Sequence, residues 1–339
     1  MPDVLELFNS ETVLNYVKDR QYAPLLGETL FPEVKHDTLD FSYLVGASSL
    51  PVVAAVHAFD TEAEIGSREA AKQALEAAYI KRKMQITEKD LIALQFPRTP
   101  QEAQYLTGRV FNDIDTLVQG VKARVELMRM EALSTGIVTL NENGLNTSID
   151  YHVPADHQET LTGTDLWTDS NADILGDLER WADELDARPT RALTSTKVLT
   201  QILRNTKVIG YIFGTGAGRV PTRADLNAFL LQHDLPTIAV YDAKYRKQNA
   251  NGTYTTARYL GENKFVMFGD GALGETLYGP TPEESRMIRE GANVSTVGKV
   301  IAMVYEEGKD PISTWTKAAA TAIPSFPEAN NVFQAQPIA

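Results

Sequence analysis

The feature that most constrains the fold is one long amphipathic stretch between Thr99 and Gly136. It opens with a threonine that can cap a helix, then Pro100, which needs no N–H at a first helical position, and then Glu102, which can close a capping box. Apolar residues recur after it in steps of three and four, and Gly136 is a typical C-terminal stop. The pattern predicts a single helix of about 35 residues, roughly 50 Å long and well beyond the average helix of a globular protein.

The surroundings of this stretch indicate what the helix packs against. Its charged residues are expected on the outer faces of the helix; they are Glu102, Arg109, Asp113, Asp115, Lys122, Arg124, Glu126, Arg129 and Glu131. A sustained apolar stripe is also typical of a coiled coil. Here, however, strand-forming residues 137–140 and 149–153 follow at once and flank Asn143-Gly144, a strong hairpin signal. We therefore expect a spine helix that lies along a sheet.

Composition narrows the class of protein. The chain has 339 residues, 43% hydrophobic and 23% charged, which is ordinary for a soluble globular protein and long enough for more than one domain. It has neither an apolar run that could span a membrane nor the start of a signal peptide. The lack of cysteine excludes disulfides, thiol catalysis and cysteine metal sites. The formal charge of −13 is opposite to that of a nucleic-acid binder; it suits an enzyme with small substrates, or a surface that lies near DNA without adhering to it.

The first ninety residues carry apolar and basic groups in segments that show little regular secondary-structure pattern. Residues 1–40 begin with a short helical pattern and continue as an irregular run, which we interpret as an extended arm or a coat over the rest of the chain. Its apolar residues include Leu25, Leu26, Leu30 and Phe31. Residues 39–56 favour strand, and residues 67–83 favour helix on propensity alone. The densest basic group of the chain follows acids at 60, 62 and 64, and comprises Arg68, Lys72, Lys81, Arg82 and Lys83. The simplest interpretation of these charges is a solvated surface.

Beyond residue 160 the chain alternates between helix and strand patterns. Helices are expected at residues 174–186, 195–205 and 222–233. A second hairpin is expected at Asn251-Gly252. Strands are expected at residues 207–213, 237–241, 254–260, 264–269, 297–306, 312–317 and 332–338. The fold class is therefore α+β, with a second α/β unit inserted after the spine.

A glycine-rich segment at residues 213–219 (FGTGAGR) follows a predicted strand, so a phosphate-binding loop must be considered. Gly214, Gly216 and Gly218 do not have the required spacing, and Pro221 stands where the helix should start. We interpret the segment as a flexible loop.

His152 and His157, with two nearby aspartates, could suggest a metal site, but their spacing does not bring the rings together, so a surface loop is expected. No nucleophile motif or acid–base pair is recognisable. The sequence predicts no enzyme, no cofactor and no bound metal.

The order of segments resembles the major capsid proteins of tailed bacteriophages with the Hong Kong 97-type fold, in detail the lambda-like capsid protein E family. Four kinds of stretch carry the likeness. They are the arm passage 22–31 (YAPLLGETLF), an extended loop represented by 64–68 (EIGSR) and its basic return 79–86 (YIKRKMQI), the strand with a polar loop at 264–279 (KFVMFGDGALGETLYG), and the tail 331–338 (NVFQAQPI). One departure concerns residues 69–78, whose helix formers imply either a helical loop tip or a propensity overridden by tertiary contacts.

The resemblance implies a division of the chain: an N-terminal arm (1–40), an extended loop (41–90), a peripheral domain with the spine helix (91–160), an axial domain (161–290) and a C-terminal return to the peripheral domain (291–339). It implies self-assembly into hexamers and pentamers of an icosahedral shell that encloses double-stranded DNA. The expected location is the virion, with assembly in the host cytoplasm. Expected partners are a scaffolding protein, a portal, a decoration protein on shells that carry one, and packaged DNA that is contacted non-specifically; no membrane partner is expected.

Because a lone subunit should not be able to bury the apolar arm or neutralise the basic return, we expect both to contact neighbouring subunits. The expected intersubunit contacts are Arg68, Lys72, Lys81, Arg82, Lys83, Leu25, Leu26, Leu30 and Phe31. Two alternatives remain open at this point. One is a soluble α/β enzyme with a phosphate-binding loop at residues 214–218, and the other is a different virion component, such as a tail or connector protein.

Overall fold

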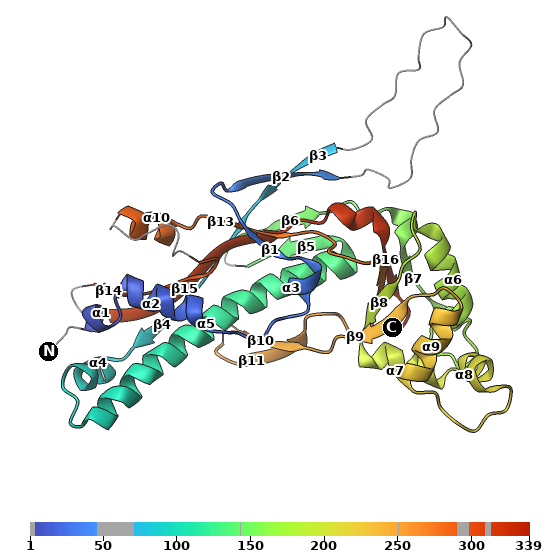
Figure 1. The fold of residues 1–339 in the computed structure, drawn as a ribbon, viewed down its shortest axis with the longest axis horizontal. Coiled ribbons are helices and arrows are strands. Elements are labelled where there is room, and N and C mark those ends of the chain that lie inside the picture. The colour runs from blue at the N-terminus through green and yellow to red at the C-terminus, as the bar shows by residue number, and fades with distance from the viewer. Residues whose placement is uncertain (1–3, 46–70, 143, 250, 290–297, 309–312) are drawn as a thin grey trace, which may run out of the picture.

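The computed structural model describes residues 4–45, 71–142, 144–249, 251–289, 298–308 and 313–339. The molecule is elongated, with the long helix α5 (Pro100–Thr135) running through one part and a second group of strands and helices at the opposite end (Figure 1). No helix among these residues is both long enough and apolar enough to cross a membrane.

The predicted spine helix is confirmed. The Thr99 side chain accepts a hydrogen bond from the Glu102 backbone N–H at 3.1 Å, and Gly136 ends the helix in the left-handed region at φ 67°. The apolar stripe is buried along most of the helix, from Leu106 to Leu133. α4 (Glu88–Gln95) precedes the helix and packs on its first turns.

The sheet beside the spine is built around β15 (Ser313–Pro324). β4 (Ala78–Ile86) pairs antiparallel with one edge of β15. The other edge pairs with β14 (Ile301–Glu307) and β13 (Thr276–Gly279), and β1 (Glu33–Lys35) lies parallel to β13. Helix α5 packs along this sheet, and α2 (Ser10–Asp19) packs on β14. Strands from both ends of the chain thus share one sheet, which places the arm against the main core.

The second group of elements surrounds a five-stranded sheet in the order β7-β16-β12-β8-β9. The bounds of these strands are Gln158–Thr160, Val332–Gln336, Phe265–Phe268, Arg191–Thr194 and Thr237–Val240. The helices around them are α6 (Ile174–Glu184), α7 (Thr196–Arg204), α8 (Thr206–Phe213) and α9 (Arg223–Gln232). In the core of this group Trp167 stacks on Trp181, and Phe265 packs edge-on against Trp167. The C-terminal strand β16 therefore joins this sheet rather than the sheet of β15.

Three two-stranded pairs and several short helices complete the described residues. The strand pairs are β2 with β3 (Asp40–Val45, Ala71–Glu76), β5 with β6 (Ile137–Leu140, Thr147–Asp150) and β10 with β11 (Lys244–Gln248, Tyr254–Arg258). The remaining helices are α1 (Val4–Leu7), α3 (Gly27–Leu30), α10 (Pro282–Arg289) and three short 3₁₀ helices. Both hairpins predicted from Asn-Gly pairs are present.

Two predicted elements are wrong. The part of residues 67–83 that is described forms strands β3 and β4, because pairing with β2 and β15 overrides a weak helix propensity. The extended loop is therefore built from strands on both sides of its tip: β2 leads to Val45 and β3 begins at Ala71. The tip itself lies outside the described residues. Residues 207–213 belong to helix α8 rather than to a strand. The Asn205 side chain caps α8 by accepting hydrogen bonds from two backbone N–H groups. This cap favours a helix for an apolar run whose periodicity is compatible with either helix or strand.

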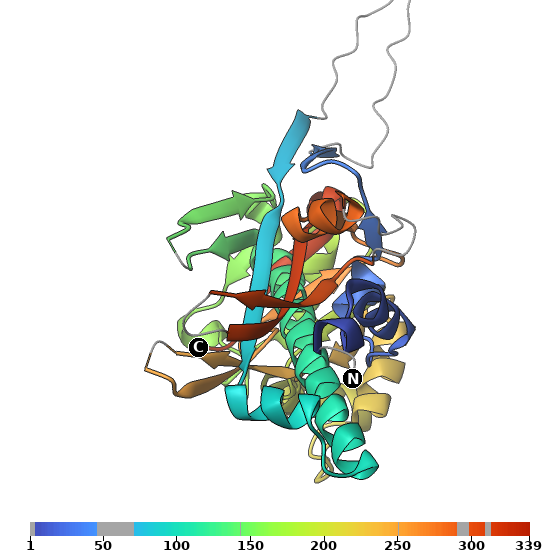
Figure 2. The same cartoon turned by 90° about the vertical axis from the view of Figure 1, so that its left-hand side faces the viewer.

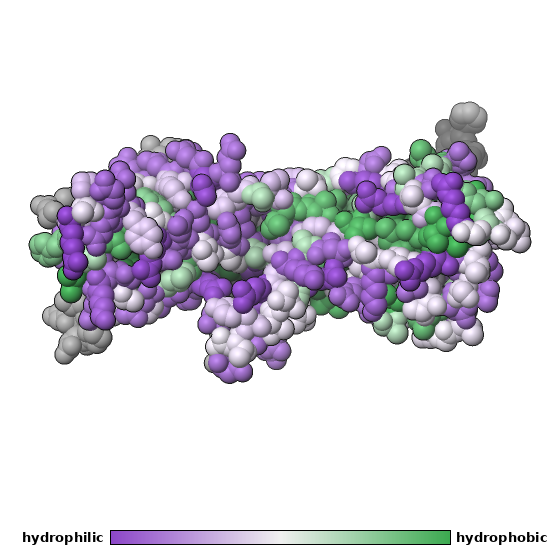
Figure 3. Space-filling model, turned by 90° about the horizontal axis from the view of Figure 1, so that it is seen from below, coloured by the Kyte–Doolittle hydropathy of each residue, from purple (hydrophilic) through white to green (hydrophobic). Residues whose placement is uncertain are grey.

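The two ends of the molecule expose different surfaces. Seen from below, apolar side chains form a band toward the end that carries α6 to α9, whereas the opposite half is mostly hydrophilic (Figure 3). The exposed apolar residues of the former end include Tyr211, Val220 and Leu231.

Candidate assembly surfaces

The paired strands β2 and β3 form a ribbon that stands away from the body (Figures 1 and 2). Phe41 and Leu75 are buried in the main core and fix the base of this ribbon. Lys72, on β3, pairs with Leu44 on β2, but the structure does not describe the Lys72 side chain. Arg68 lies outside the described residues altogether. The predicted contacts of these two residues therefore stay predictions.

The N-terminal arm runs along its own spine helix. Leu30 and Phe31 are only 2% and 0% exposed, and Phe31 packs edge-on against Phe326 at 5.7 Å between ring centroids. Leu25 and Leu26 are half-buried. The argument that a lone subunit cannot bury these apolar residues is wrong for Leu30 and Phe31, because the arm reaches the core of its own chain.

Two carboxylates of α5 hold this arm in place. Asp115 accepts hydrogen bonds from the hydroxyls of Tyr16 (2.8 Å) and Tyr22 (2.9 Å) and lies 3.2 Å from Arg20. Burial, and then the hydrogen bond to Asp115, raise the pKa of Tyr22, so the phenol stays protonated as the donor. The arm is thus tied to the spine through polar groups as well as apolar contacts.

Three turns further along the helix, Glu126 and Arg129 form the centre of a buried polar cluster. Their side chains are 0% and 1% exposed. Glu126 accepts hydrogen bonds from the Gly27 backbone N–H (2.9 Å) and the Tyr241 hydroxyl (2.7 Å). Arg129 donates to Glu33 at 2.9 Å and to the Thr276 hydroxyl at 2.8 Å. The cluster therefore connects the arm, the spine and both sheets.

The charges in this cluster stabilise one another. Burial by itself raises the pKa of Glu33, but the hydrogen bond and charge of Arg129, together with Lys299, lower it below its ordinary value. The expectation that Asp115, Glu126 and Arg129 lie on the outer faces of the helix is wrong. Residues 115 and 126 are eleven positions apart, which places them on the same helix face after three turns, but this spacing does not show that the face is covered.

The basic return, strand β4, lies on the surface, with Lys81, Arg82 and Lys83 exposed. Lys83 lies 3.3 Å from Glu307 and 4.0 Å above the ring of Trp315, both in its own chain. Arg82 donates to the Gln248 side chain at 3.1 Å. Among the described residues, neither Lys81 nor Arg82 forms an ion pair with an acid. Of these three cations, Lys83 is therefore paired with an acid of its own subunit.

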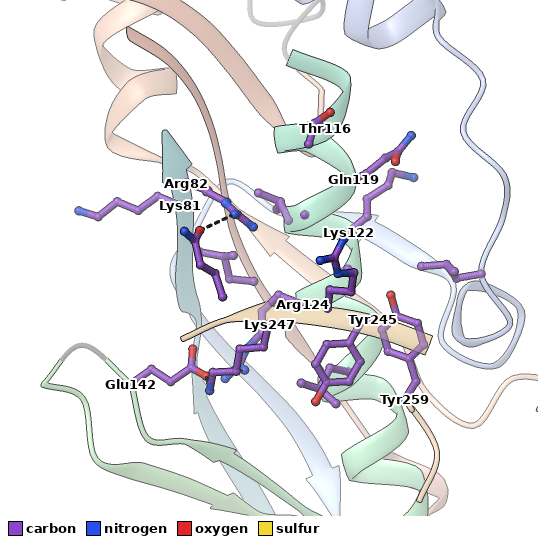
Figure 4. Close-up of a pocket in the computed structure, with 18 of the residues that line it drawn as sticks. Lys81, Arg82, Thr116, Gln119, Lys122, Arg124, Glu142, Tyr245, Lys247 and Tyr259 are labelled. Atoms are coloured by element: carbon purple, nitrogen blue, oxygen red, sulfur yellow. Dashed lines mark hydrogen bonds and ion pairs between the residues drawn. The ribbon is translucent and has the colours of Figure 1, made fainter. Parts of the chain in front are cut away.

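A groove of 1220 Å³ lies between β4, the spine, the arm and the β10–β11 hairpin (Figure 4). Its cationic lining residues are Lys81, Arg82, Lys122, Arg124, Arg246 and Lys247. The acids in the lining are Glu131 and Glu142. Burial raises the pKa of Glu142, but Lys247 and Arg124 outweigh this and lower it, so this acid is committed to two of the cations. The groove therefore keeps an excess of positive charge in a chain whose net charge is −13.

Residues 214–218, His152 and His157 do not have the arrangement that a phosphate-binding or metal site requires. Gly214 ends helix α8, so residues 214–218 do not follow a strand as a phosphate-binding loop would. His152 is exposed as expected, whereas His157 is buried, with its Nε2 atom 3.1 Å from the Glu184 carbonyl oxygen. The described residues contain no group of three or more potential metal ligands.

Comparison with known proteins decides the family. The model of the family "phage major capsid protein E" matches residues 10–336. The chain belongs to this family of capsid proteins. Its fold and its family are those of a structural protein of the virion, so the chain is a phage major capsid protein that builds a shell from copies of itself, and not an enzyme.

Solved structures agree on the fold of this capsid protein. A protein described as the capsid protein of a prophage of E. coli CFT073 is 17% identical, with a TM-score of 0.63, over 98% of this chain and 99% of that chain. A phage-related protein of Bordetella bronchiseptica RB50 is 13% identical, with a TM-score of 0.56, over 96% of each chain. No curated protein sequence matches the chain. The likeness confirms the Hong Kong 97-type fold inferred from the order of segments.

Proposed function

We propose that this capsid protein associates as hexamers and pentamers of an icosahedral shell that encloses the double-stranded DNA genome, and that assembly takes place in the host cytoplasm. In this proposal residues 1–40 act as the arm, 41–90 as the extended loop, 91–160 and 291–339 as the peripheral domain, and 161–290 as the axial domain. Strands β13 and β16 cross this division and join the two domains. The net negative charge suits a wall that encloses DNA without adhering to it.

The β2–β3 ribbon is the observation that supports this proposal most directly. A two-stranded ribbon is marginally stable by itself in water. Of the ribbon side chains that the structure describes, Phe41 and Leu75 anchor its base in the core of its own chain. A neighbouring subunit would supply the missing partner surface along the rest of the ribbon. Such contacts are expected wherever an element extends away from the body that should bury it.

The proposed intersubunit contacts follow from exposure and charge. Arg68, Lys72, Lys81 and Arg82 are proposed to meet acids of an adjacent subunit, and Lys83 to exchange its pair with Glu307 for such an acid. Pairs of this kind at the rim of an interface set register and partner choice more than affinity. Leu25 and Leu26 are proposed to contact a neighbour through their exposed parts. Leu30 and Phe31 act indirectly, by holding the arm on the spine.

Other partners are proposed by analogy with the family alone. They are a scaffolding protein and a portal during assembly, packaged DNA contacted non-specifically, and a decoration protein on shells that carry one. No membrane takes part.

Electron microscopy of the purified full-length chain tests the proposed function. Closed shells with pentameric and hexameric clusters are the expected result; rings, tubes or only small oligomers would contradict it. The double variant Arg82→Glu/Lys83→Glu should remain folded by circular dichroism but form few shells. The matched control is Lys197→Glu/Arg223→Glu, which reverses two exposed cations on α7 and α9, at the other end of the molecule. Normal shells from the β4 variant would refute the role given to these two residues.

A further inference from the structure

The groove beside the spine helix gathers cations from three separate elements (Figure 4). They are Arg82 on β4, Arg124 on α5, and Arg246 and Lys247 on β10. Within the part of the chain that the structure describes, neither Arg82 nor Arg246 forms an ion pair. Arg82 donates to the neutral side chain of Gln248, and Arg246 lies 4.4 Å from the centroid of the Tyr254 ring. Their charges are therefore available to a ligand.

One carboxylate of the chain itself lies among these cations. Glu142 is 3.4 Å from Arg124 and also forms an ion pair with Lys247. Two cations thus share one acid, which leaves a positive charge between them. Their side chains converge on a position that accepts a carboxylate, so the chemistry of the groove suits carboxylate ligands.

Apolar and aromatic side chains lie between the cations of the groove. They are Leu25, Ile80, Val121, Leu127, Tyr22 and Tyr245. A DNA duplex gains its contacts mainly through phosphate and sugar, which apolar side chains do not bind. A duplex is also stiff, with a persistence length of about 150 base pairs, and cannot bend into a groove within one subunit. A polypeptide matches the lining better, because it carries carboxylates and apolar side chains on one flexible chain.

Two strand edges border the groove. Among the described strands, β4 pairs only with β15 and β10 only with β11, so each has one edge without a partner. The hydrogen bond of 3.1 Å from Arg82 to Gln248 links the two strands. An extended peptide can bind such an edge through its backbone, and its side chains then alternate between two faces. The ligand that fits is therefore extended, with acids and apolar residues at alternate positions.

The described acidic clusters of this chain are not free to enter the groove. They lie on helices α6 and α10 and at the end of strand β14, and would have to leave these folded elements first. On α10, Glu283 and Glu284 are already paired with Lys317 and Lys35. A different protein is therefore the favoured source of an extended acidic segment.

Resting on the proposed function, we propose that the groove of an unassembled subunit binds an extended acidic segment of a different protein, in which acids alternate with apolar residues. The carboxylates of this segment pair with Arg82, Arg246 and Lys247, and its apolar side chains lie against Leu25 and Ile80. Arg82 is also assigned to a contact with an adjacent subunit in the shell, so the two contacts exclude each other. The acidic segment therefore leaves the groove when that neighbour docks.

Fluorescence anisotropy with the unassembled full-length chain tests this site. The probe is a short labelled peptide in which glutamate and valine alternate. The comparison ligands are a peptide of the same composition with all glutamates before all valines, and a short labelled DNA duplex. The alternating peptide should bind about tenfold more tightly than either comparison ligand, and more tightly to the unassembled subunit than to closed shells.

Two variants of the groove should change the affinity for the alternating peptide in opposite directions. Arg246→Ala/Lys247→Ala should weaken binding by about tenfold, since each exposed ion pair contributes about a two- to fivefold change. Glu142→Gln should strengthen it by about two- to fivefold, because it frees Arg124 and Lys247 from the carboxylate that they share. The matched control Lys197→Ala/Arg223→Ala, on α7 and α9, should leave the affinity unchanged.

A photo-cross-link provides a second measurement that leaves the cations intact. The chain contains no natural cysteine, so Gln119→Cys places a single benzophenone label in the groove, and Lys197→Cys places the control label on α7. Only the groove label should capture the alternating peptide. A cross-link between two copies of the chain in place of the peptide would overturn the assignment to a different protein.

The remaining outcomes separate this proposal from the proposed function. Equal or tighter binding of the duplex or the block peptide, equal binding to closed shells, or no response to the groove variants would overturn the acidic segment as the occupant. If the wild-type chain binds the peptide but forms no closed shells by electron microscopy, the proposed function fails and the groove remains a binding site.

Discussion

Gly27 lies where the arm contacts Glu126 and Arg129 of the spine helix, and its replacement by alanine tests how the arm is held. A Cβ atom built on Gly27 would lie 2.4 Å from Oε2 of Glu126 and 2.7 Å from Cδ of Arg129. The backbone there is helical, so alanine is not excluded by its φ angle. Any loss of unfolding free energy in Gly27→Ala therefore comes from the contact of the added Cβ with the buried Glu126–Arg129 cluster.

The size of the penalty follows from what must move. Glu126 cannot retreat without weakening its hydrogen bonds to the Gly27 N–H and the Tyr241 hydroxyl, each worth about 1.5–3 kcal/mol because the acceptor is charged. Against this, alanine in a compatible backbone stabilises by about 0.4–1 kcal/mol, by reducing the entropy of the unfolded chain. The net expectation is a loss of about 2–4 kcal/mol of unfolding free energy.

Urea unfolding of the unassembled subunit measures this loss directly, from the shift of the midpoint at unchanged slope. The matched control is Gly108→Ala on α5, where the added Cβ meets nothing within 4 Å. Alanine favours the interior of a helix, so the control should gain about 0.5–1 kcal/mol. A Gly27→Ala variant as stable as the wild type would show that the arm is not clamped on the cluster in the free subunit, and would refute the reasoning.

Three further predictions concern the same core. Phe31→Ala should cost about 3–5 kcal/mol in the unassembled subunit, by urea unfolding, because its partner Phe326 is in the same chain; a defect seen only in shell assembly would contradict this. Gly274→Ala should prevent folding, because its Cβ would lie 2.1 Å from the Ser325 carbonyl oxygen, whereas Gly269→Ala, with nothing within 4 Å, should express as soluble protein. Burial raises the pKa of Glu283, but hydrogen bonds from Lys317 and Tyr79 lower it below its ordinary 4.5, so its stabilisation is present above that pH and is lost as the pH falls further. Stability should therefore drop less steeply below pH 4.5 in Glu283→Gln than in the wild type, and parallel curves would exclude this linkage.

Local signals in the sequence predict the spine helix and both Asn-Gly hairpins, because each depends on neighbours within a few residues. Thr99 caps the helix it precedes, and Gly136 adopts the left-handed conformation that ends it. Elements decided by distant partners are not predicted. Strand β4 contains helix-compatible residues but pairs with β15, more than two hundred positions away in the chain.

The buried charges were missed for the same reason. Asp115, Glu126 and Arg129 have the composition of a solvated helix face, and nothing nearby in the sequence shows that the arm and the β13 strand cover them. The premise that a lone subunit cannot bury Leu30 and Phe31 is wrong in the opposite sense, because the irregular arm reaches the core of its own subunit. In both cases the missing information is which distant segment covers a given face.

The location of the arm has a consequence for assembly. Because the arm is already ordered on its own spine through Asp115, Glu126 and the core around Phe31, its conformational entropy is lost when the subunit folds. Joining a shell therefore adds no ordering cost for this segment, and its contacts with neighbours count in full toward association. The described parts of the extended loop are held by Phe41 and Leu75 at the base of the ribbon and by the pairing of β4 with β15. Any part of the loop that gains its order only on a neighbour would add an ordering cost at assembly, which reduces the affinity of each contact and lets misplaced subunits dissociate before a shell closes.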